Sequence, residues 1–282
     1  MKVIAESGST TTEWVLVDGK NVLERSFTEG INPFFQTRRE ISHSIRLNLP
    51  ETFFKKRWER VYFYGAGCAN LDKKNILEAS LVAQFKTPIS AESDLLAAAR
   101  GLLIDKPGIA CILGTGSNSC LYDGERIIKN VRSAGYILGD EGSGTALGKR
   151  LIGDWLKGLL DEELSGKLAE NYGWNEADII RKVYREPEAN RFLASFTPFL
   201  KAHRTHPAVH RILTDCFKAF FERNIMAYRP GPLAVHFVGS IAAIFREELE
   251  ETAGIYGIRI GNILREPIGR MVAYHQQKLK NE

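Results

Sequence analysis

The stretch MKVIAESGSTTTEWVLVDG, residues 1–19, places one glycine among hydroxyl side chains between two apolar runs. The runs at 3–6 and 13–18 are rich in β-branched and aromatic residues, which favour strands. Asp18-Gly19 is a hairpin turn signal, and KNVLERSF (20–27) reads as a third strand. The hydroxyls that crowd the first turn around Gly8 are Ser7, Ser9, Thr10, Thr11 and Thr12.

The same pattern returns in IACILGTGSNSCLYDGERIIKNV, residues 109–131. It again predicts an apolar strand, a Gly/Ser/Thr turn, a strand, an Asp-Gly turn and a third strand. A duplicated domain with a cleft between its halves would produce this internal repeat. Between the repeats we expect strands at 60–67 and 87–94 and helices at 37–49, 71–85 and 95–103.

The second half of the chain is predicted to be mainly helical as far as Tyr228, where Arg229-Pro230-Gly231-Pro232 ends the last helix. A strand, a glycine turn and a helix follow, and the chain closes with a short strand and an amphipathic helix. This mixed alternation indicates an α/β protein with sheet cores. The expected helices are 146–160, 176–184, 208–228 and 266–280, and the expected strand-turn-helix and short strand are 233–251 and 257–261.

Composition bounds the class of protein. The 282 residues are 44% hydrophobic and carry a net charge of +4, spread without a basic run, which argues against nucleic-acid binding. We find no apolar run of the ~20 residues that span a bilayer, and Lys2 and Glu6 interrupt any leader-like stretch. The four cysteines lack metal-ligand spacing, and Cys111 and Cys216 read as buried thiols of a reducing compartment. We therefore expect a soluble, cytoplasmic protein.

Three glycine turns each follow an apolar strand, at 8–12, 114–117 and 239–240. Glycine lets backbone N–H groups approach an anion, and Ser or Thr hydroxyls add donors for phosphate oxygens. The sequence has neither the G-x-x-x-x-G-K-[ST] motif nor a G-x-G-x-x-G opening a helix after the first strand. Taken singly, each stretch could equally be an ordinary turn.

GYILGDEGSGTALGKRL, residues 135–151, holds Asp140 and Glu141 in a glycine-rich loop before a helix. Such adjacent acids suit polar-ligand recognition or Mg²⁺ chemistry. The alternative is a capping loop, with Asp140 or Ser143 as N-cap.

Asp94, in SAESD, is either a helix N-cap or a general base at the carboxyl end of a strand. Asn32, before Pro33, either faces a ligand or begins a turn. His203, His206 and His210 invite a metal interpretation, but Pro207 interrupts the helix that would align them.

In this order and spacing, the motifs resemble the N-acetylglucosamine kinase-like branch of the BadF/BadG/BcrA/BcrD ATPase family, within the actin-like sugar kinase superfamily. The resemblance covers essentially the whole chain. It implies a duplicated ribonuclease-H-like (actin-like ATPase) fold, with mixed five-stranded sheets flanked by helices and a nucleotide cleft between two domains. The domains would be 1–114 plus 267–282, and 115–266. The matching motifs are ESGSTTTEW, GINPF, YFYGAGC, AESD, CILGTGSNSCLYDG, GYILGDEGSG and HFVGSIA.

The resemblance also implies roles for individual residues. Asp94 would act as the base, and Glu6 would hold Mg²⁺ through water. The ATP phosphates would meet Gly8, Ser9, Thr10, Gly114, Thr115, Gly116 and Ser117, and adenosine would meet Gly239 and Ser240. The sugar would meet Asn32, Thr115, Asn118, Gly135 and Asp140.

Three positions depart from the family's usual motif: Glu6 and Glu13 replace aspartates, and Thr11 replaces a lysine. We expect catalysis to survive, because a water-mediated metal contact absorbs some shift. The implied reaction is Mg²⁺-ATP-dependent phosphorylation of an amino sugar, N-acetylglucosamine to its 6-phosphate, by a homodimer, with glucosamine and N-acetylmuramic acid as further candidate substrates. One alternative is an activator ATPase, although Cys111 and Cys120 do not suit an iron–sulfur cluster. Another is a sugar or nucleotide sensor with weakened catalysis.

Overall fold

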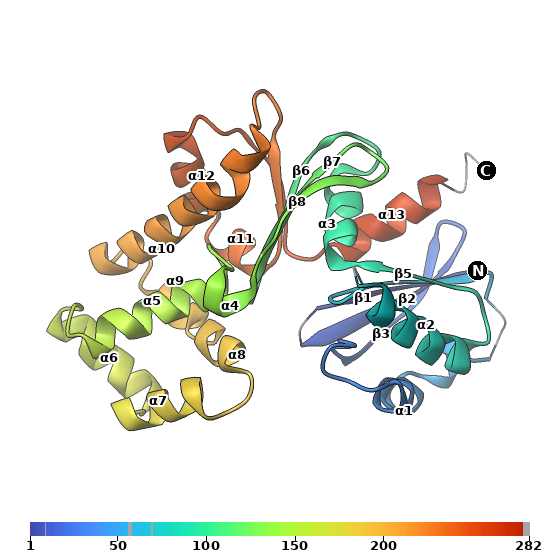
Figure 1. Ribbon diagram of the computed structural model, residues 1–282, viewed down its shortest axis with the longest axis horizontal. Coiled ribbons are helices and arrows are strands. Elements are labelled where there is room, and N and C mark those ends of the chain that lie inside the picture. The colour runs from blue at the N-terminus through green and yellow to red at the C-terminus, as the bar shows by residue number, and fades with distance from the viewer. Residues whose placement is uncertain (9, 56–57, 69, 279–282) are drawn as a thin grey trace. The chain divides into compact units, whose positions relative to one another are not determined.

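The computed structural model describes residues 1–8, 10–55, 58–68 and 70–278 (Figure 1). The chain divides into two compact units. Unit 1 comprises Met1–Pro107, Asp123–Ile127 and Glu266–Glu282, and unit 2 comprises Gly108–Tyr122 and Ile128–Arg265. Each unit has a mixed five-stranded sheet in its described residues, flanked by helices. This is the duplicated α/β architecture predicted from the repeat.

The sheet of unit 1 has the strand order β3-β2-β1-β4-β5. The hairpin strands pair antiparallel, and β4 and β5 add to β1 in parallel. The carboxyl ends of β1, β4 and β5 therefore lie at one edge, where α/β folds place ligands. The strands are β1 (Lys2–Ser7), β2 (Thr11–Asp18), β3 (Asn21–Glu29), β4 (Arg60–Gly65) and β5 (Ile89–Ser93).

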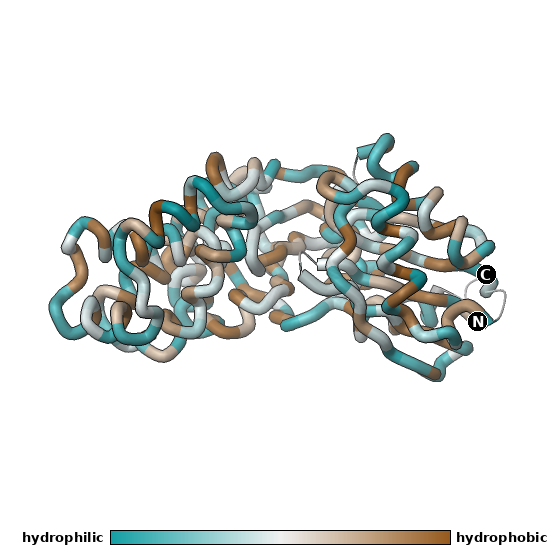
Figure 2. The backbone as a smooth tube through the Cα atoms, turned by 90° about the horizontal axis from the view of Figure 1, so that it is seen from below, coloured by the Kyte–Doolittle hydropathy of each residue, from teal (hydrophilic) through white to brown (hydrophobic). Residues whose placement is uncertain are grey.

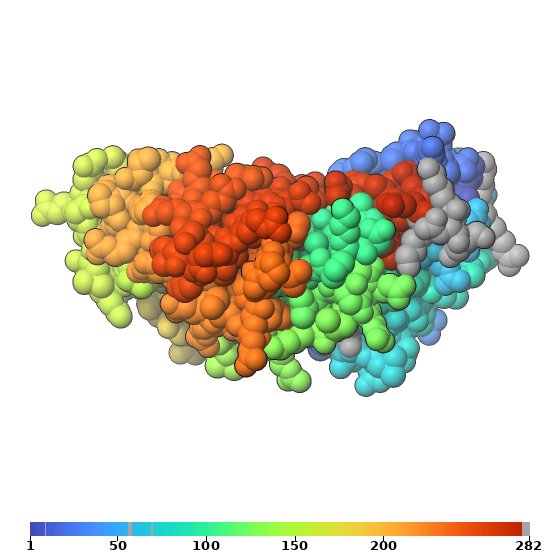
Figure 3. Space-filling model, turned by 90° about the horizontal axis from the view of Figure 1, so that it is seen from above, coloured from blue at the N-terminus to red at the C-terminus, as the bar shows by residue number. Residues whose placement is uncertain are grey.

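Alternating side chains give the unit 1 sheet two hydrophobic faces. Trp14 and Phe63 pack on one face against α1 (Arg38–Asn48) and α2 (Leu71–Phe85). Ile4 and Val15 pack on the other, against α3 (Asp94–Leu103) and the C-terminal helix α13 (Ile268–Lys278). Helix α13 packs along α3 and is the red segment of unit 1 in Figure 3. The last helix thus completes the core that the first strand begins.

The sheet of unit 2 has the order β10-β9-β6-β7-β8. Strand β6 pairs antiparallel with β7 and parallel with β9. It is thus the central strand of unit 2, although the boundary expected at residue 114 places it in the first domain. The strands are β6 (Gly108–Leu113), β7 (Ser117–Tyr122), β8 (Ile127–Val131), β9 (Val235–Val238) and β10 (Ile260–Leu264).

Helices cover the unit 2 sheet, and α10 and α12 pack side by side. Hydrophobic and hydrophilic stretches alternate along the helical part of this unit in Figure 2, as one-sided burial requires. The helices are α4 (Gly135–Leu138), α5 (Gly144–Leu156), α6 (Glu162–Tyr172), α7 (Glu176–Tyr184), α8 (Ala189–Ala194), α9 (Thr197–Ala202), α10 (Pro207–Phe220), α11 (Ser240–Ile244) and α12 (Arg246–Ile255).

Three boundaries differ from expectation for identifiable reasons. Helix α5 ends at Leu156, before Gly158, which has a φ of +67°. Strand β10 starts at Ile260, after the turn made by Gly257 at φ +62°. The helix expected over 208–228 continues from α10 into a π turn, Phe221–Ile225, and a 3₁₀ turn, Met226–Tyr228.

The histidines singled out by the sequence have separate protein partners. The ring of His206 caps α10 through the Ala208 N–H and contacts Asp161 at 3.1 Å, whereas His210 contacts Glu251 at 2.9 Å. The part of the chain that the structure describes contains no cluster of three or more His, Cys, Asp or Glu suited to a metal ion. The described helices are all too short or too polar to cross a membrane.

Candidate functional site

The hydroxyls of the β1–β2 turn divide into two groups. Ser7 and Thr12 are buried, and their side-chain oxygens lie 2.8 Å apart. Ser7 Oγ accepts the Ile31 N–H at 2.8 Å, and Thr12 Oγ1 donates to the Glu29 carbonyl at 3.0 Å. These two hydroxyls therefore hold the hairpin to the segment that follows β3. Thr10 and Thr11 are exposed and remain available to a ligand, whereas Ser9 lies outside the described residues.

The turn itself places no steric demand on Gly8. Its N–H donates to the Thr11 carbonyl at 3.0 Å, and the Thr10 carbonyl accepts from Gly30 at 2.9 Å. A Cβ at position 8 would come no nearer to the described residues than 3.7 Å, from the Thr11 oxygen. The folded turn therefore does not require glycine at position 8. A glycine there would allow a ligand to approach the backbone closely.

Carboxylates gather at the end of β1. Glu6 lies directly opposite Glu13 across the antiparallel ladder, and Arg25 Nη1 pairs with Glu13 at 2.7 Å. Burial, followed by the charges of Asp94, Glu13 and Glu266, raises the pKa of Glu6 to about 7. Arg25 neutralises Glu13, so Glu6 and Asp94 are the carboxylates whose hard oxygen atoms would suit a Mg²⁺ ion held largely by water and phosphate.

Asp94 is the first residue of α3, and it is not the N-cap. Ser93 is the N-cap, because its Oγ accepts the Leu96 N–H at 3.2 Å. Asp94 Oδ1 accepts the Leu95 N–H at 2.8 Å. Burial raises the pKa of the Asp94 carboxyl above its ordinary value. The capping alternative is thus fulfilled by the preceding serine, and a partly buried carboxylate remains at the carboxyl end of β5.

Asn32 begins a turn, which is one of the two sequence interpretations. Its Oδ1 accepts the Phe34 N–H at 3.0 Å, and its carbonyl accepts from Phe35 and Gln36, both at 3.1 Å. The Nδ2 group is therefore the part of the side chain through which Asn32 could bind a sugar hydroxyl.

In unit 2 the 114–117 turn rests on the start of α5. The Gly114 and Thr115 carbonyls accept the N–H groups of Gly144 and Thr145 at 2.8 and 3.1 Å. The N-cap of α5 is Ser143, whose Oγ accepts the Ala146 N–H at 3.1 Å. The capping alternative for the glycine-rich loop is thus met by Ser143, and Asp140 has a different partner.

The side chain of Asp140 contacts the 114–117 turn directly. Its Oδ1 accepts the Ser117 N–H at 3.1 Å, and a Cβ at Gly116 would lie 3.1 Å from its Oδ2. The backbone of Asp140 is left-handed, with φ +56°, a costly conformation that is enriched at functional sites. Burial raises its pKa. The structure therefore brings Gly116, Ser117 and Asp140 together, and their contact with a ligand stays a prediction.

Gly239 lies against the same turn. At φ +126°, a Cβ there would lie 2.2 Å from the Leu113 carbonyl oxygen and 3.2 Å from Gly114 N. Only glycine fits this close approach between the ends of β9 and β6. Ser240 is the first residue of α11.

Two further residues expected near the sugar have structural partners. Asn118 Oδ1 accepts from Ser119 N and Asn130 Nδ2, each at 2.9 Å, so this oxygen is committed to the sheet. Gly135 begins α4 with φ +73°, and its carbonyl accepts the Gly139 N–H at 2.8 Å.

Comparison with known proteins gives a clear relative among solved structures. Neither the family models nor the curated proteins gave a match to the sequence. The "Putative N-acetylglucosamine Kinase" of Porphyromonas gingivalis is 43% identical, with a TM-score of 0.95, covering 99% of this chain and 100% of its own. This chain belongs to the N-acetylglucosamine kinase-like family.

More distant structures share the fold. The protein of the same printed name from Chromobacterium violaceum is 17% identical, with a TM-score of 0.76, covering 97% of this chain and 98% of its own. A ROK family glucokinase from Streptomyces griseus, solved with glucose and AMPPNP, is 13% identical with a TM-score of 0.56, covering 99% and 98%. The N-acetylglucosamine kinase-like family thus has the actin-like fold of sugar kinases.

Sequence reasoning missed two residues that lie near the carboxylates of Glu6 and Glu13. Glu266 adds negative charge near Glu6, and Arg25 neutralises Glu13. Arg25 lies two residues from Phe27, the register partner of Glu13, so the β2–β3 alternation could have placed both on one face. Glu266 is far away in sequence, and no local pattern places it near β1.

Proposed function

We propose that this protein transfers the γ-phosphoryl group of ATP to an amino sugar, converting N-acetylglucosamine to its 6-phosphate. The carboxylate of Asp94 is the observation that carries the proposal. It stands at the carboxyl end of β5 with a raised pKa, while Ser93 performs the capping. Membership of the N-acetylglucosamine kinase-like family supports the same reaction class.

In this reaction Asp94 accepts the proton of the sugar hydroxyl as its oxygen attacks the γ-phosphorus. The bond from that phosphorus to the bridging oxygen breaks, ADP departs, and Asp94 later releases its proton to water. A raised pKa makes Asp94 a stronger base, provided that it is ionised when the sugar arrives. General-base catalysis of this kind supplies about 10²–10⁴ in rate.

The remaining roles follow the grouping of residues within each unit. Gly8, Ser9 and Thr10 of unit 1, and Gly114 to Ser117 of unit 2, would lie against the phosphate oxygens, with Gly239 and Ser240 against adenosine. The N–H groups of Gly8, Gly114 and Ser117 already donate within the protein, so these residues would contribute close approach of the backbone or, for Ser117, the hydroxyl. Asn32, Thr115, Asn118, Gly135 and Asp140 would bind the sugar, and for Asn118 only Nδ2 remains for that purpose because Oδ1 is committed.

Glu6 would hold Mg²⁺ through water, since its carboxylate lies among other acids and carries a raised pKa. When bound, Mg²⁺ neutralises charge on the phosphate oxygens of ATP. We further propose a cytoplasmic homodimer. We do not propose an activator ATPase, because Cys111 and Cys120 are buried and their thiol pKa values are raised, to about 12 for Cys120.

The test compares Asp94→Asn with Asp72→Asn, because both aspartates lie in the first turn of a unit 1 helix. A coupled ADP-release assay with N-acetylglucosamine, glucosamine and N-acetylmuramic acid measures turnover. We expect Asp94→Asn to lower kcat about 10²–10⁴-fold with little change in ATP affinity, and Asp72→Asn to match the parent. Full activity in Asp94→Asn would refute the base assignment, and absence of turnover with every sugar would refute the kinase.

A further inference from the structure

One hydroxyl group in unit 2 joins helix α8 to the 114–117 turn. The hydroxyl of Thr145 donates to two carbonyl oxygens, that of Thr115 at 2.7 Å and that of Asn190 at 3.0 Å. A single proton is thus shared between two acceptors. Because both oxygens lie within hydrogen-bond distance of one atom, the backbone at Asn190 is close to Thr115, a residue with proposed contacts to sugar and phosphate.

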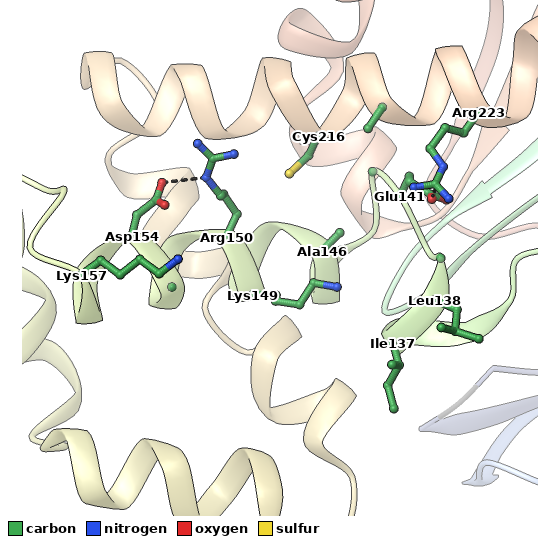
Figure 4. A pocket seen from close by; sticks show the side chains of 14 residues that line it. Ile137, Leu138, Glu141, Ala146, Lys149, Arg150, Asp154, Lys157, Cys216 and Arg223 are labelled. Atoms are coloured by element: carbon green, nitrogen blue, oxygen red, sulfur yellow. Dashed lines mark hydrogen bonds and ion pairs between the residues drawn. The ribbon is translucent and has the colours of Figure 1, made fainter.

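The helix that carries Asn190, α8, is held closely against α5. A Cβ at Gly148 of α5 would lie 1.8 Å from the carbonyl oxygen of Leu193 in α8, so only glycine permits this contact. The side of α5 that faces α10 is different, because Ala146 and Arg150 there line a cavity of about 610 Å³ (Figure 4). Close packing on α5 therefore fixes the position of α8, and with it the position of Asn190.

The side of α8 that contains Asn190 is next to the start of α5. A Cβ at Gly144 would lie 3.2 Å from Ala194 Cβ and 3.4 Å from the Gly114 carbonyl oxygen. Ala194 lies four residues after Asn190, so the two residues share one face of α8. This contact leads to the same turn as the Thr145 hydroxyl does, through different atoms.

The side chain of Asn190 has no partner in the part of the chain that the structure describes. Asn70 and Asn175 cap helices, whereas Asn190 is the second residue of α8. Its side chain is half-buried and makes no hydrogen bond with any described residue. Asparagine is a poor choice within a helix, because its amide competes with backbone hydrogen bonds. The amide of Asn190 is therefore available to a ligand.

The chain enters α8 through a strained residue. Glu188 has a φ of +61°, a left-handed conformation that costs free energy in a residue other than glycine. Its side chain does not cap the helix. The local sequence therefore does not favour the start of α8, and the contacts with α5 hold it in place. Strain of this kind is concentrated at ligand sites, which agrees with a ligand role for Asn190 two residues later.

A primary amide matches the group that distinguishes N-acetylglucosamine from other hexoses. The acetamido group at C2 has an N–H donor and a C=O acceptor, and the side chain of Asn190 offers an acceptor oxygen and a donor NH₂. Glucose has only a hydroxyl at C2, and the ammonium group of glucosamine offers donors alone. A site that uses both ends of an amide would leave a polar group unpaired with either of these sugars.

Building on the proposed function, we propose that Asn190 selects the sugar, with its side-chain amide hydrogen-bonded to the acetamido group of N-acetylglucosamine. Asn190 lies outside every motif that carries the family resemblance, so those motifs do not reveal it. It takes no part in phosphoryl transfer. Its loss therefore changes which sugar binds and leaves the chemical step unchanged.

The experiment is isothermal titration of the full-length protein, without ATP, with N-acetylglucosamine, glucosamine and glucose. The titrations are run at about pH 6.5, where glucosamine carries an ammonium group. The test variants are Asn190→Ala and Asn190→Asp. The matched control is Asn171→Ala, which alters an exposed asparagine of α6 in the same unit. Circular dichroism and melting temperature check the folding of each variant.

We expect Asn190→Ala to bind N-acetylglucosamine at least ~10-fold more weakly than the parent, while its affinity for glucose changes less than ~2-fold. Asn190→Asp should shift the preference toward glucosamine, because a carboxylate accepts from an ammonium group and repels the acetamido carbonyl. The control Asn171→Ala should match the parent for all three sugars.

The outcomes separate this inference from the kinase proposal. If the parent binds N-acetylglucosamine and Asn190→Ala keeps the same selectivity among the three sugars, the role of Asn190 is overturned and the kinase proposal stands. An equal loss of N-acetylglucosamine affinity in Asn171→Ala would also overturn the role of Asn190, since the effect would not be specific to that amide. Failure of the parent to bind any of the three sugars would overturn both proposals.

Discussion

The carboxylate of Glu6 faces that of Glu13 across the β1–β2 ladder, and Arg25 pairs with Glu13. Like charges directly opposite each other on a sheet are destabilising. Burial is the main cause that raises the pKa of Glu6 to about 7, and the charges of Asp94 and then Glu13 add to it. The ionised form of Glu6 is thus destabilised in the folded protein alone, and a bound cation would stabilise it.

The first prediction concerns stability. The folded pKa of Glu6 exceeds its ordinary value of 4.5, so the folded state binds this proton more tightly than the unfolded state. The resulting stability is complete below pH 4.5 and is lost as pH rises to about 7, by about 3 kcal/mol. Glu6→Gln should therefore unfold at a higher temperature than the parent at pH 8 without Mg²⁺, and the gap should shrink at pH 5. Equal gaps at both pH values, measured by calorimetry, would contradict this assignment.

The second prediction concerns the metal. With a pKa of about 7, Glu6 is about 10% ionised at pH 6 and about 90% at pH 8. Because the ionised carboxylate is the ligand, the affinity for Mn²⁺ in the presence of ADP should rise about tenfold between these pH values. Electron paramagnetic resonance of free Mn²⁺ measures it, and Glu6→Gln should flatten the profile. A parent profile as flat as that of the variant would exclude Glu6 from the metal site.

At the scale of elements, the glycine turns that follow β1 and β9 differ in their steric requirement for glycine. At Gly8 an added Cβ has room, whereas at Gly239 it would lie 2.2 Å from a backbone oxygen. The same sequence pattern, a glycine with hydroxyls after an apolar strand, thus includes one glycine that the fold does not require and one that it does.

We therefore expect Gly8→Ala and Gly239→Ala to fail in different ways. Gly8→Ala should melt within a few degrees of the parent yet bind ATP at least ~10-fold more weakly, because the methyl group would contact the nucleotide and not the protein. Gly239→Ala should unfold at a clearly lower temperature, since β6 and β9 must separate. Thermal melting and nucleotide titration of both variants, with Gly19→Ala at a β2–β3 turn position as reference, distinguish the cases. Unchanged ATP affinity in Gly8→Ala would remove the β1–β2 turn from the phosphate site.

At the scale of the whole molecule, each unit has its own hydrophobic core, and the chain returns to unit 1 to finish it. Met271 of α13 is fully buried against Ile4 and Val15 of the first two strands. Leu213 of α10 is fully buried in the core of unit 2. Each core therefore depends on side chains distant in sequence from its first strand.

Truncating these side chains should loosen one sheet at a time. Met271→Ala should cost about 2–5 kcal/mol and speed amide exchange in β1 and β4, while Leu213→Ala should do the same in β6 and β9. Each variant serves as the control for the other in hydrogen-exchange mass spectrometry. Equal loss of protection in both sheets from either variant would show that the two cores unfold as one.

Much of the fold could be predicted from local patterns. Helices 71–85 and 176–184 match α2 and α7 residue for residue, because apolar spacing and an Asn cap define them. The strand repeat predicted both sheets. Tertiary pairing assigned β6 to unit 2, and positive-φ glycines shifted the limits of α5 and β10, which residue type alone does not reveal.

The candidate site was predicted less completely. Sequence grouped the hydroxyls of the first turn, but burial divided Ser7 and Thr12 from Thr10 and Thr11. For α3 the expected cap was Asp94, and the neighbouring Ser93 proved to be the cap. For α5 the sequence offered Asp140 or Ser143, and Ser143 is the cap. The identity of an N-cap depends on which side chain reaches a given backbone N–H. Sequence spacing alone does not distinguish between two adjacent polar residues.

Ser7 Oγ receives the Ile31 amide, and the next residue is Asn32. The same serine follows Glu6 in β1. This one hydrogen bond therefore links the residue before Asn32, a proposed sugar ligand, to the residue after Glu6, a proposed metal ligand. On the roles proposed above for Asn32 and Glu6, a shift of the sugar-binding segment would pass through this hydrogen bond to the strand that carries the metal ligand.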